Sequence, residues 1–144
     1  MGHLKVAHVN MRSLNTGFAE FSNIVSDFGF DVIGGSKTWL DPNTPSEYYT
    51  IPGYVMLRHD RKSHLQRPSS EVTGGGVALY VRSSVAYDIH PLNEDVDHNI
   101  EGICVVLKVK QIKVGICVGY RPSYVHDTFF QVYFTHFLWI WLWR

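Results

Sequence analysis

The sequence predicts an α/β (α+β) fold in which strands dominate and one helix connects the first two of them. Near the N-terminus, an apolar run, a segment with helical spacing and a second apolar run follow one another, which is the order of a βαβ unit. In the second half, two long runs rich in β-branched residues flank a tight connection, which is typical of a hairpin. With 144 residues the chain has about the length of one domain, so we expect these parts to share a core.

The first two strands should deliver polar residues to the same place. Residues 4–9 are mostly apolar, as in a buried strand, and Asn10 follows them. Residues 30–33 form the second apolar run, and the polar segment Ser36-Lys37-Thr38 comes shortly after it. Because polar residues gather beyond the strand ends of an α/β unit, we expect Asn10 and this segment to meet.

A helix is predicted between these two strands. Five apolar residues recur at helical spacing: Phe18, Phe21, Ile24, Val25 and Phe28. Asn15 or Thr16 can cap its start, and Gly29 stands where a helix commonly stops. We therefore expect the helix to end near residue 28.

The next region is dominated by turns. Pro42, Pro45 and the pair Pro52-Gly53 interrupt it, and residues 54–58 give a short strand. Residues 59–73 are polar and are typical of a loop.

Three glycines, residues 74–76, lead directly into residues 77–82, whose β-branched and aromatic side chains favour a strand. A phosphate cradle would need a helix behind the glycines, so a flexible hairpin entry is the simpler interpretation. Residues 87–90 predict a weak strand. Residues 103–110 and 113–120 predict a strong pair, with Gln111 at the tight connection.

Composition excludes some classes of partner and compartment. Thirteen basic and thirteen acidic residues give a formal net charge of zero, so any contact with nucleic acid or a membrane must be local. The N-terminus lacks the apolar run of a signal peptide. Cys104 and Cys117 lie in apolar, strand-like segments without zinc spacing. We expect reduced core cysteines in an intracellular protein, with a disulfide as the alternative.

The C-terminal segment differs in kind, so we divide the chain into a domain at residues 1–123 and an aromatic-rich tail at 124–144. Apolar residues at helical spacing between 129 and 141, preceded by Asp127 or Thr128 as a cap, predict an amphipathic helix. The continuously apolar run 137–143 is shorter than the about 20 residues that span a bilayer. We expect no membrane span and a buried or interfacial end. Because no terminating loop precedes Arg144, we expect an interrupted domain.

Several ordered segments resemble a known family. They are Val9-Asn10-Met11-Arg12-Ser13-Leu14, Asp31-Val32-Ile33 with Thr38-Trp39-Leu40, Ile51-Pro52-Gly53-Tyr54, residues 74–83, and Gly119-Tyr120-Arg121-Pro122. In this order they resemble the N-terminal part of the endonuclease/exonuclease/phosphatase family, specifically the endonuclease domain of non-LTR retrotransposon polyproteins. The resemblance covers roughly residues 4–123.

The resemblance implies a two-sheet α/β sandwich, here C-terminally truncated, that cleaves phosphodiesters with Mg²⁺. In this branch of the family the enzyme nicks DNA to prime reverse transcription, so DNA is the expected partner and a nuclear location is expected. Magnesium requires hard oxygen ligands, and it stabilises charge on the transferring phosphoryl group.

The resemblance also carries over two catalytic positions. Asn10 matches the family asparagine that orients a metal ligand or the phosphate; a polar cap on a strand end is the alternative. Tyr120 matches the tyrosine that points at the scissile phosphate, with Arg121 beside it as a phosphate contact. The alternative for Tyr120 is a tyrosine at the end of a core strand, before a turn at Pro122.

The family's metal-binding glutamate stands immediately before the Thr-Trp-Leu triplet, and this position is Lys37. A protonated lysine has three donors and no lone pair, so it repels Mg²⁺ instead of binding it, and no intact metal site is expected. Two alternatives remain open. Lys37 could hold a phosphate in place of the metal, or it could be a solvated surface lysine.

Two later family elements, an Asp-x-Asn strand and a final Asp-His pair, do not occur after Tyr120. The only acid there is Asp127, and His126 and His136 lie on or beside the predicted tail helix. Loss of a metal ligand and of the general base costs orders of magnitude in rate. We therefore expect a vestigial site.

A basic loop offers a further contact with DNA. Its basic residues are Arg58, Arg61, Lys62 and Arg67. They could follow a phosphate backbone and give salt-dependent affinity. A solvated loop is the alternative, since no aromatic residue interrupts the run.

The sequence thus predicts a fragment of a Mg²⁺-dependent DNA endonuclease that has lost its activity. One alternative is a non-catalytic relic that binds nucleic acid or another partner. The other is a family phosphatase that acts on a small phosphoester.

Overall fold

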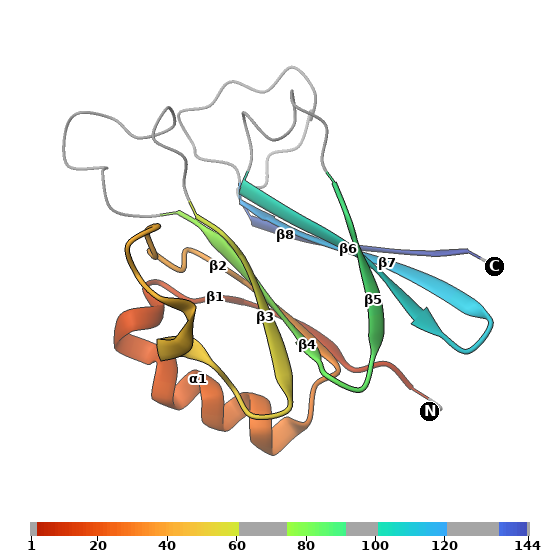
Figure 1. The fold of residues 1–144 in the computed structure, drawn as a ribbon, viewed down its shortest axis with the longest axis horizontal. Coiled ribbons are helices and arrows are strands. Elements are labelled where there is room, and N and C mark those ends of the chain that lie inside the picture. The colour runs from red at the N-terminus through yellow and green to blue at the C-terminus, as the bar shows by residue number, and fades with distance from the viewer. Residues whose placement is uncertain (1–2, 61–74, 92–100, 121–135, 144) are drawn as a thin grey trace.

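The computed structural model describes residues 3–60, 75–91, 101–120 and 136–143. These residues form two stacked sheets, with one α-helix on the outer face of the first (Figure 1). The first sheet has the strand order β1-β2-β4-β3, and the second has the order β5-β6-β7-β8. The first sheet consists of β1 (Val6–Asn10), β2 (Val32–Ser36), β4 (Val77–Arg82) and β3 (Tyr54–His59). The second consists of β5 (Ala86–His90), β6 (Glu101–Val109), β7 (Ile112–Tyr120) and β8 (His136–Trp143).

The predicted βαβ unit is present. Strands β1 and β2 pair in parallel, and α1 (Leu14–Phe28) connects them across the outer face of the first sheet (Figure 1). All other strand pairs in the described ranges are antiparallel. A 3₁₀ helix at Ser46–Tyr49 lies in the connection before β3. The α/β class and the two-sheet sandwich expected from the sequence are therefore confirmed.

The ends of α1 agree only in part with the sequence. Gly29 ends the helix in the left-handed conformation, with φ of 62°, as predicted. The predicted cap at Asn15 or Thr16 is wrong: Ser13 is the N-cap residue, and its side chain makes no capping hydrogen bond. Instead, the backbone N–H groups of Ser13 and Leu14 donate to the carbonyls of Lys37 and Thr38, at 2.9 Å each. The segment after β2 therefore satisfies groups that a side chain usually caps.

The tail differs most from the expectation. A helix was expected between residues 129 and 141, but residues 136–143 form strand β8, which pairs with β7 along its whole length. The first part of the predicted helix lies outside the described residues. Residues 136–143 form a strand and not a helix because the edge of β7 offers them a full row of backbone donors and acceptors. Aromatic and β-branched residues also suit a pleated surface. Its first residue, His136, pairs with Tyr120.

The core lies on both sides of the first sheet. Between the two sheets, buried residues of β2, β4, β6 and β7 form one cluster; examples are Val32, Leu79, Val105 and Ile116. Between the first sheet and α1, a second cluster joins Phe21 and Val25 to Ile33 and Tyr80. Strand β4 contributes to both clusters because successive residues of a strand point to opposite faces.

The two sheets approach closely over β2. A Cβ atom on Gly34 would lie 3.0 Å from Cγ2 and 3.1 Å from Cβ of Val118 on β7. Few real Cβ atoms come so close to a neighbour, so a larger residue at this position requires Val118 to move by a few tenths of an ångström. Gly34 thus sets the separation of the sheets.

Asp31 ties the opposite end of the first sheet together. Its carboxylate accepts from the backbone N–H of Lys5 at 2.8 Å and from Nε of Arg82 at 3.1 Å. The guanidinium of Arg82 also donates to the carbonyl of Gly29 at 2.6 Å. The starts of β1 and β2, the end of α1 and the end of β4 are held at one point.

Cys104 and Cys117 face each other across β6 and β7 and form a disulfide. The expectation of two reduced cysteines is therefore wrong for this structure. Both residues are buried, and their direct opposition in the strand register brings the sulfur atoms together.

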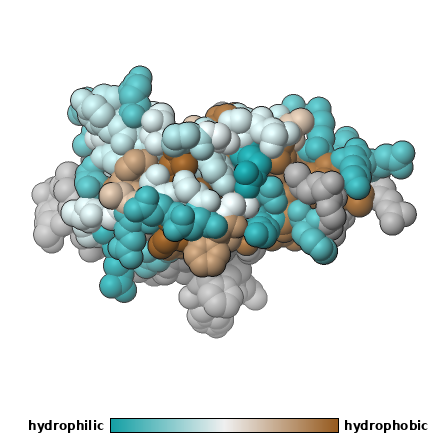
Figure 2. All heavy atoms as spheres, turned by 90° about the horizontal axis from the view of Figure 1, so that it is seen from below, coloured by the Kyte–Doolittle hydropathy of each residue, from teal (hydrophilic) through white to brown (hydrophobic). Residues whose placement is uncertain are grey.

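The surface seen from below the view of Figure 1 is mixed, with hydrophilic side chains around apolar ones (Figure 2). Exposed large apolar residues in the described ranges include Phe28, Tyr48 and Ile89. The residues that the structure describes contain no helix long and apolar enough to cross a membrane.

We predict that Gly34→Val lowers the free energy of unfolding by about 1–3 kcal/mol, because the new side chain overlaps Val118. Gly17→Ala is the matched control, since a Cβ at this helical glycine meets nothing within 4 Å. It should raise the free energy by about 0.5–1 kcal/mol. Urea unfolding measures both, and equal stability of Gly34→Val and the wild type would contradict the account of sheet separation.

We also predict that a dithiol reductant lowers the melting temperature of the wild type. A bond that closes a loop over a sequence separation of 13 contributes up to about 3 kcal/mol. The double variant Cys104→Ser, Cys117→Ser should melt at the lower temperature with or without reductant. Detection of two reactive thiols in the natively folded, unreduced protein would show that the bond does not form.

Candidate active site

Two strand ends of the first sheet meet at one end of the sandwich. Asn10, the last residue of β1, pairs with Ser36, the last residue of β2. The backbone N–H of Met11 donates to the carbonyl of Ser36 at 2.8 Å, so the two chains stay together beyond the strands. Asn10 is exposed and Ser36 is fully buried. The structure thus brings Asn10 to the polar segment that the sequence indicated.

The second sheet contributes Tyr120 to the same end. Tyr120 ends β7, is half-buried and packs against the core cluster between the sheets. Nζ of Lys37 lies 5.9 Å from the centre of its ring, in a cation–π contact. Lys37 and Tyr120 are therefore neighbours, and Asn10 lies at the same end of the first sheet through its pairing with Ser36, the residue before Lys37.

Gly75 and Gly76 serve this end in a structural role. Both have positive φ, at 71° and 83°, and their carbonyls accept from the backbone N–H groups of Trp39 and Thr38 at 3.0 and 3.3 Å. A Cβ on Gly76 would lie 2.5 Å from Oγ1 of Thr38. The carbonyls of these two glycines therefore bond to the protein's own backbone. This agrees with the expectation that the glycines do not form a phosphate cradle.

Sequence reasoning missed Glu101 as part of this end. Its side chain is fully buried, and its Oε1 accepts from the backbone N–H of Gly76 at 3.3 Å. Glu101 begins β6 and pairs with Tyr120 in the register. An acidic residue at the start of a strongly apolar strand is unusual, and this feature of the sequence could have indicated that Glu101 is buried.

The backbone at this end is strained. Four residues other than glycine have positive φ here: Arg12, Ser13, Lys37 and Trp39, at 47°, 86°, 58° and 59°. Each costs on the order of 1–2 kcal/mol and persists only where the surroundings impose it. Such residues concentrate at functional sites.

The described residues at this end do not fit Mg²⁺. The position that the resemblance assigns to a metal-binding glutamate carries the ammonium of Lys37, which has no lone pair. No group of three His, Cys, Asp or Glu side chains among the described residues could hold a metal ion. We therefore derive no step through a metal at this site.

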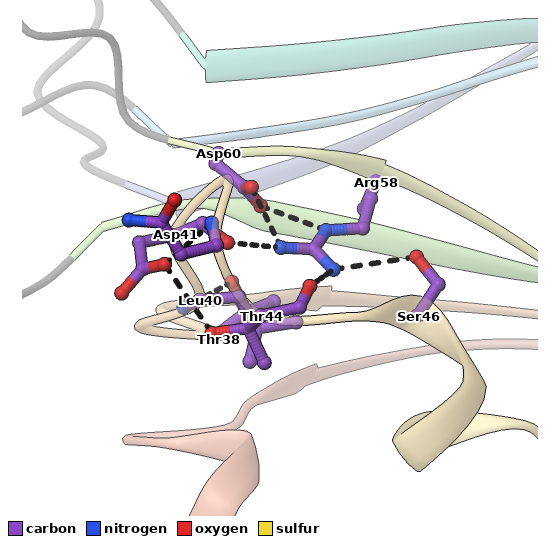
Figure 3. Close-up of polar contacts among 8 residues, drawn as sticks. Thr38, Leu40, Asp41, Thr44, Ser46, Arg58 and Asp60 are labelled. Carbon is purple, nitrogen blue, oxygen red and sulfur yellow. Dashed lines mark hydrogen bonds and ion pairs between the residues drawn. The ribbon is translucent and has the colours of Figure 1, made fainter.

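Arg58, one of the expected phosphate contacts, bonds to the protein itself in the described residues (Figure 3). Its guanidinium forms two bonds to the carboxylate of Asp60, at 3.0 and 2.7 Å. It also donates to the carbonyls of Thr44 and Asp41, at 2.7 and 2.8 Å, and to the hydroxyl of Ser46 at 3.3 Å. Every guanidinium nitrogen is engaged, so Arg58 anchors the segment before the 3₁₀ helix to β3.

The other expected phosphate contacts lie outside the described residues. They are Arg61, Lys62, Arg67 and Arg121. The histidine and the aspartate noted after Tyr120, His126 and Asp127, lie outside them as well. These expectations stay predictions.

Two hollows open beside this end, and neither is lined by Lys37 or Tyr120. One, of about 240 Å³, lies between the end of β1 and α1, with Asn10 and Ser13 among mostly apolar residues. The other, of about 250 Å³, lies between the ends of β3 and β5, where His59 and His90 line it. Of the polar residues at this end, Asn10 is exposed, whereas Lys37 and Tyr120 are half-buried.

His8 is a half-buried titratable group on β1. It pairs with Gly34 in the register, and its Nε2 atom is out of contact with solvent and has no hydrogen-bond partner in the described part of the chain. Burial lowers the pKa of His8 from its usual 6.5, because the charged form loses its hydration.

The fold of this chain is that of exonuclease/phosphatase-type enzymes. It resembles the 3′ phosphatase NExo from Neisseria, solved bound to a product DNA hairpin, with 19% identity and a TM-score of 0.53 over 77% of this chain and 39% of that one. Similar structures include the 3′-5′ exonuclease NExo from Neisseria meningitidis, with 20% identity, a TM-score of 0.47 and coverage of 76% and 39%. A mannosyl-6-phosphatase from Bacteroides thetaiotaomicron has 15% identity, a TM-score of 0.43 and coverage of 97% and 51%.

No protein-family model matches the sequence, and no curated protein matches it. The chain spans about two fifths of the length of the Neisseria enzyme, at 39%. The likeness at this identity therefore establishes the fold, and activity has to be argued from the site.

We predict that His8 makes the protein less stable in mild acid. Its folded pKa lies below the unfolded value of 6.5, so the unfolded chain binds the proton more readily as the pH falls. This contribution to stability is lost from pH 6.5 down to the folded pKa. His8→Gln should therefore show a smaller loss of unfolding free energy than the wild type between about pH 7.5 and about pH 5.5.

The matched control substitution is His3→Gln, at an exposed histidine outside the sheets. Urea unfolding at both pH values measures all three proteins. Identical pH dependence of His8→Gln and the wild type would contradict the role of His8.

Proposed function

We propose that this chain is the N-terminal part of the endonuclease domain of a non-LTR retrotransposon polyprotein and that it no longer cleaves DNA. The observation that carries the loss of activity is Lys37 at the end of β2, beside Asn10 and Tyr120. A metal-dependent phosphodiesterase needs oxygen ligands at such a strand end. An ammonium at contact distance repels a divalent cation.

The assignment to this branch of the family rests on the ordered motifs of the sequence. The fold and the placement of the motif residues support it. Asn10 and Tyr120 come from different sheets and more than 100 positions apart in the chain, yet both lie at the end of the sandwich that carries Lys37. In this proposal the domain comprises residues 1–123, the ancestral substrate is DNA and the location is nuclear.

A second function is favoured by one observation. Within the described ranges, Nζ of Lys37 has a cation–π contact with Tyr120 and no carboxylate partner. An available ammonium at a former phosphodiesterase site suits a relic that binds nucleic acid without cutting it.

A test of nicking activity addresses the first proposal. Purified protein incubated with supercoiled DNA and Mg²⁺ should leave the DNA uncut at the level of a protein-free control. Nicking that Asn10→Ala abolishes would overturn the proposal, because it would show an intact catalytic site. Nicking unaffected by Asn10→Ala would indicate a contaminating nuclease, and repeating the assay after further purification should remove it.

Binding of Mn²⁺, a paramagnetic substitute for Mg²⁺, provides a second readout that does not depend on a complete domain. The wild type should not bind Mn²⁺ at this end, whereas Lys37→Glu should gain binding because it restores a carboxylate ligand. Line broadening of Tyr120 and its neighbours in NMR spectra locates the ion. Broadening in the wild type would contradict the proposed loss of the metal site.

A further inference from the structure

We propose that the ammonium of Lys37 replaces the metal ion, so that this end of the sandwich binds the phosphate groups of a nucleic acid without a divalent cation. This inference rests on the proposed function, since it concerns the same site. It adds a ligand and a mode of binding to a site that has lost its catalytic metal.

The backbone fixes the place of Lys37. Its carbonyl accepts from Ser13 at 2.9 Å, and the next residue, Thr38, is fully buried and bonded through its N–H to Gly76. The residue itself has a left-handed φ of 58°, a conformation that a lysine adopts only when its surroundings impose it. Backbone hydrogen bonds to the segment after β1 and to the glycine before β4 therefore fix the Cα atom from which the Lys37 side chain extends.

The charge of Lys37 lacks a counter-charge in the described part of the chain. Three other cationic side chains there pair with aspartates: Arg58 with Asp60, Arg82 with Asp31, and Lys108 with Asp88. Lys37 is half-buried, and among the described residues its Nζ faces the ring of Tyr120, a contact that uses none of its three N–H donors in a hydrogen bond to a carboxylate. An anion is the ligand that such a group binds.

The neighbouring groups favour phosphate as that anion. The carboxamide of Asn10 is exposed at the end of β1 and can donate N–H bonds. Phosphate oxygens accept several such bonds at once, and a lysine binds them as a point charge. Binding of this kind needs no Mg²⁺ and continues in EDTA.

The test measures binding of a short single-stranded oligodeoxynucleotide, with and without a 3′-phosphate, by fluorescence anisotropy in EDTA. The wild type should bind equally well in EDTA and in Mg²⁺. Lys37→Met, which keeps the length of the side chain and removes the charge, should weaken binding about tenfold or more and lower the salt slope by about one. The difference between the two oligonucleotides tells whether a terminal or an internal phosphate occupies the site.

Lys113→Met is the charge-matched control, because Lys113 is exposed at the start of β7, far from Tyr120. It should bind within about twofold of the wild type, since one distant charge is largely screened. Circular dichroism checks that each variant folds. If Lys37→Met does not fold, Lys37→Gln serves in its place.

Lys37→Glu should lose binding in EDTA and regain part of it in Mg²⁺. Equal affinity of Lys37→Met and the wild type, or wild-type binding that requires Mg²⁺, would overturn this inference. The absence of nicking would then still support the proposed function. Conversely, Mg²⁺-dependent nicking by the wild type would remove the proposed function itself.

Discussion

The contact between Gly34 on β2 and Val118 on β7 is the constraint on which the rest of the structure depends. Because Gly34 has no side chain, the two sheets lie so close that a Cβ atom would stand 3.0 Å from Val118. Lys37 follows Gly34 by three residues, and Tyr120 follows Val118 by two. The close approach of the sheets therefore places the ends of β2 and β7 within reach of each other, and Nζ of Lys37 lies over the ring of Tyr120.

A second consequence is that the strand-end site is built from backbone in unusual conformations. The segment after β2 crosses over Gly75 and Gly76 and also satisfies the start of α1. The glycines that first suggested a phosphate cradle thus hold the segment that carries Lys37. The strain at Lys37 and Trp39 is balanced by these bonds and by the burial of Thr38.

Lys37 is the residue on which our proposals about this site depend. It lies beyond the end of β2, where its methylene stem needs little room within the strand. An ammonium has no lone pair for a metal ion, but it can donate to phosphate oxygens. In our proposals, the loss of cleavage and the binding of phosphate without metal both rest on this one side chain.

The sequence by itself determined the elements whose local pattern is strong: the βαβ order, the end of α1 at Gly29, strands β3, β4, β6 and β7, and the meeting of Asn10 with residues near Ser36. It also indicated β5, from a weaker pattern. The tertiary structure decided β8, because the open edge of β7 outweighed a helical spacing of aromatic residues. It also decided the disulfide, the burial of Glu101 and the structural role of Arg58. Each of these four features depends on which residue of another strand or loop lies opposite. The periodicity of residues along one segment does not tell which other segment it will pair with.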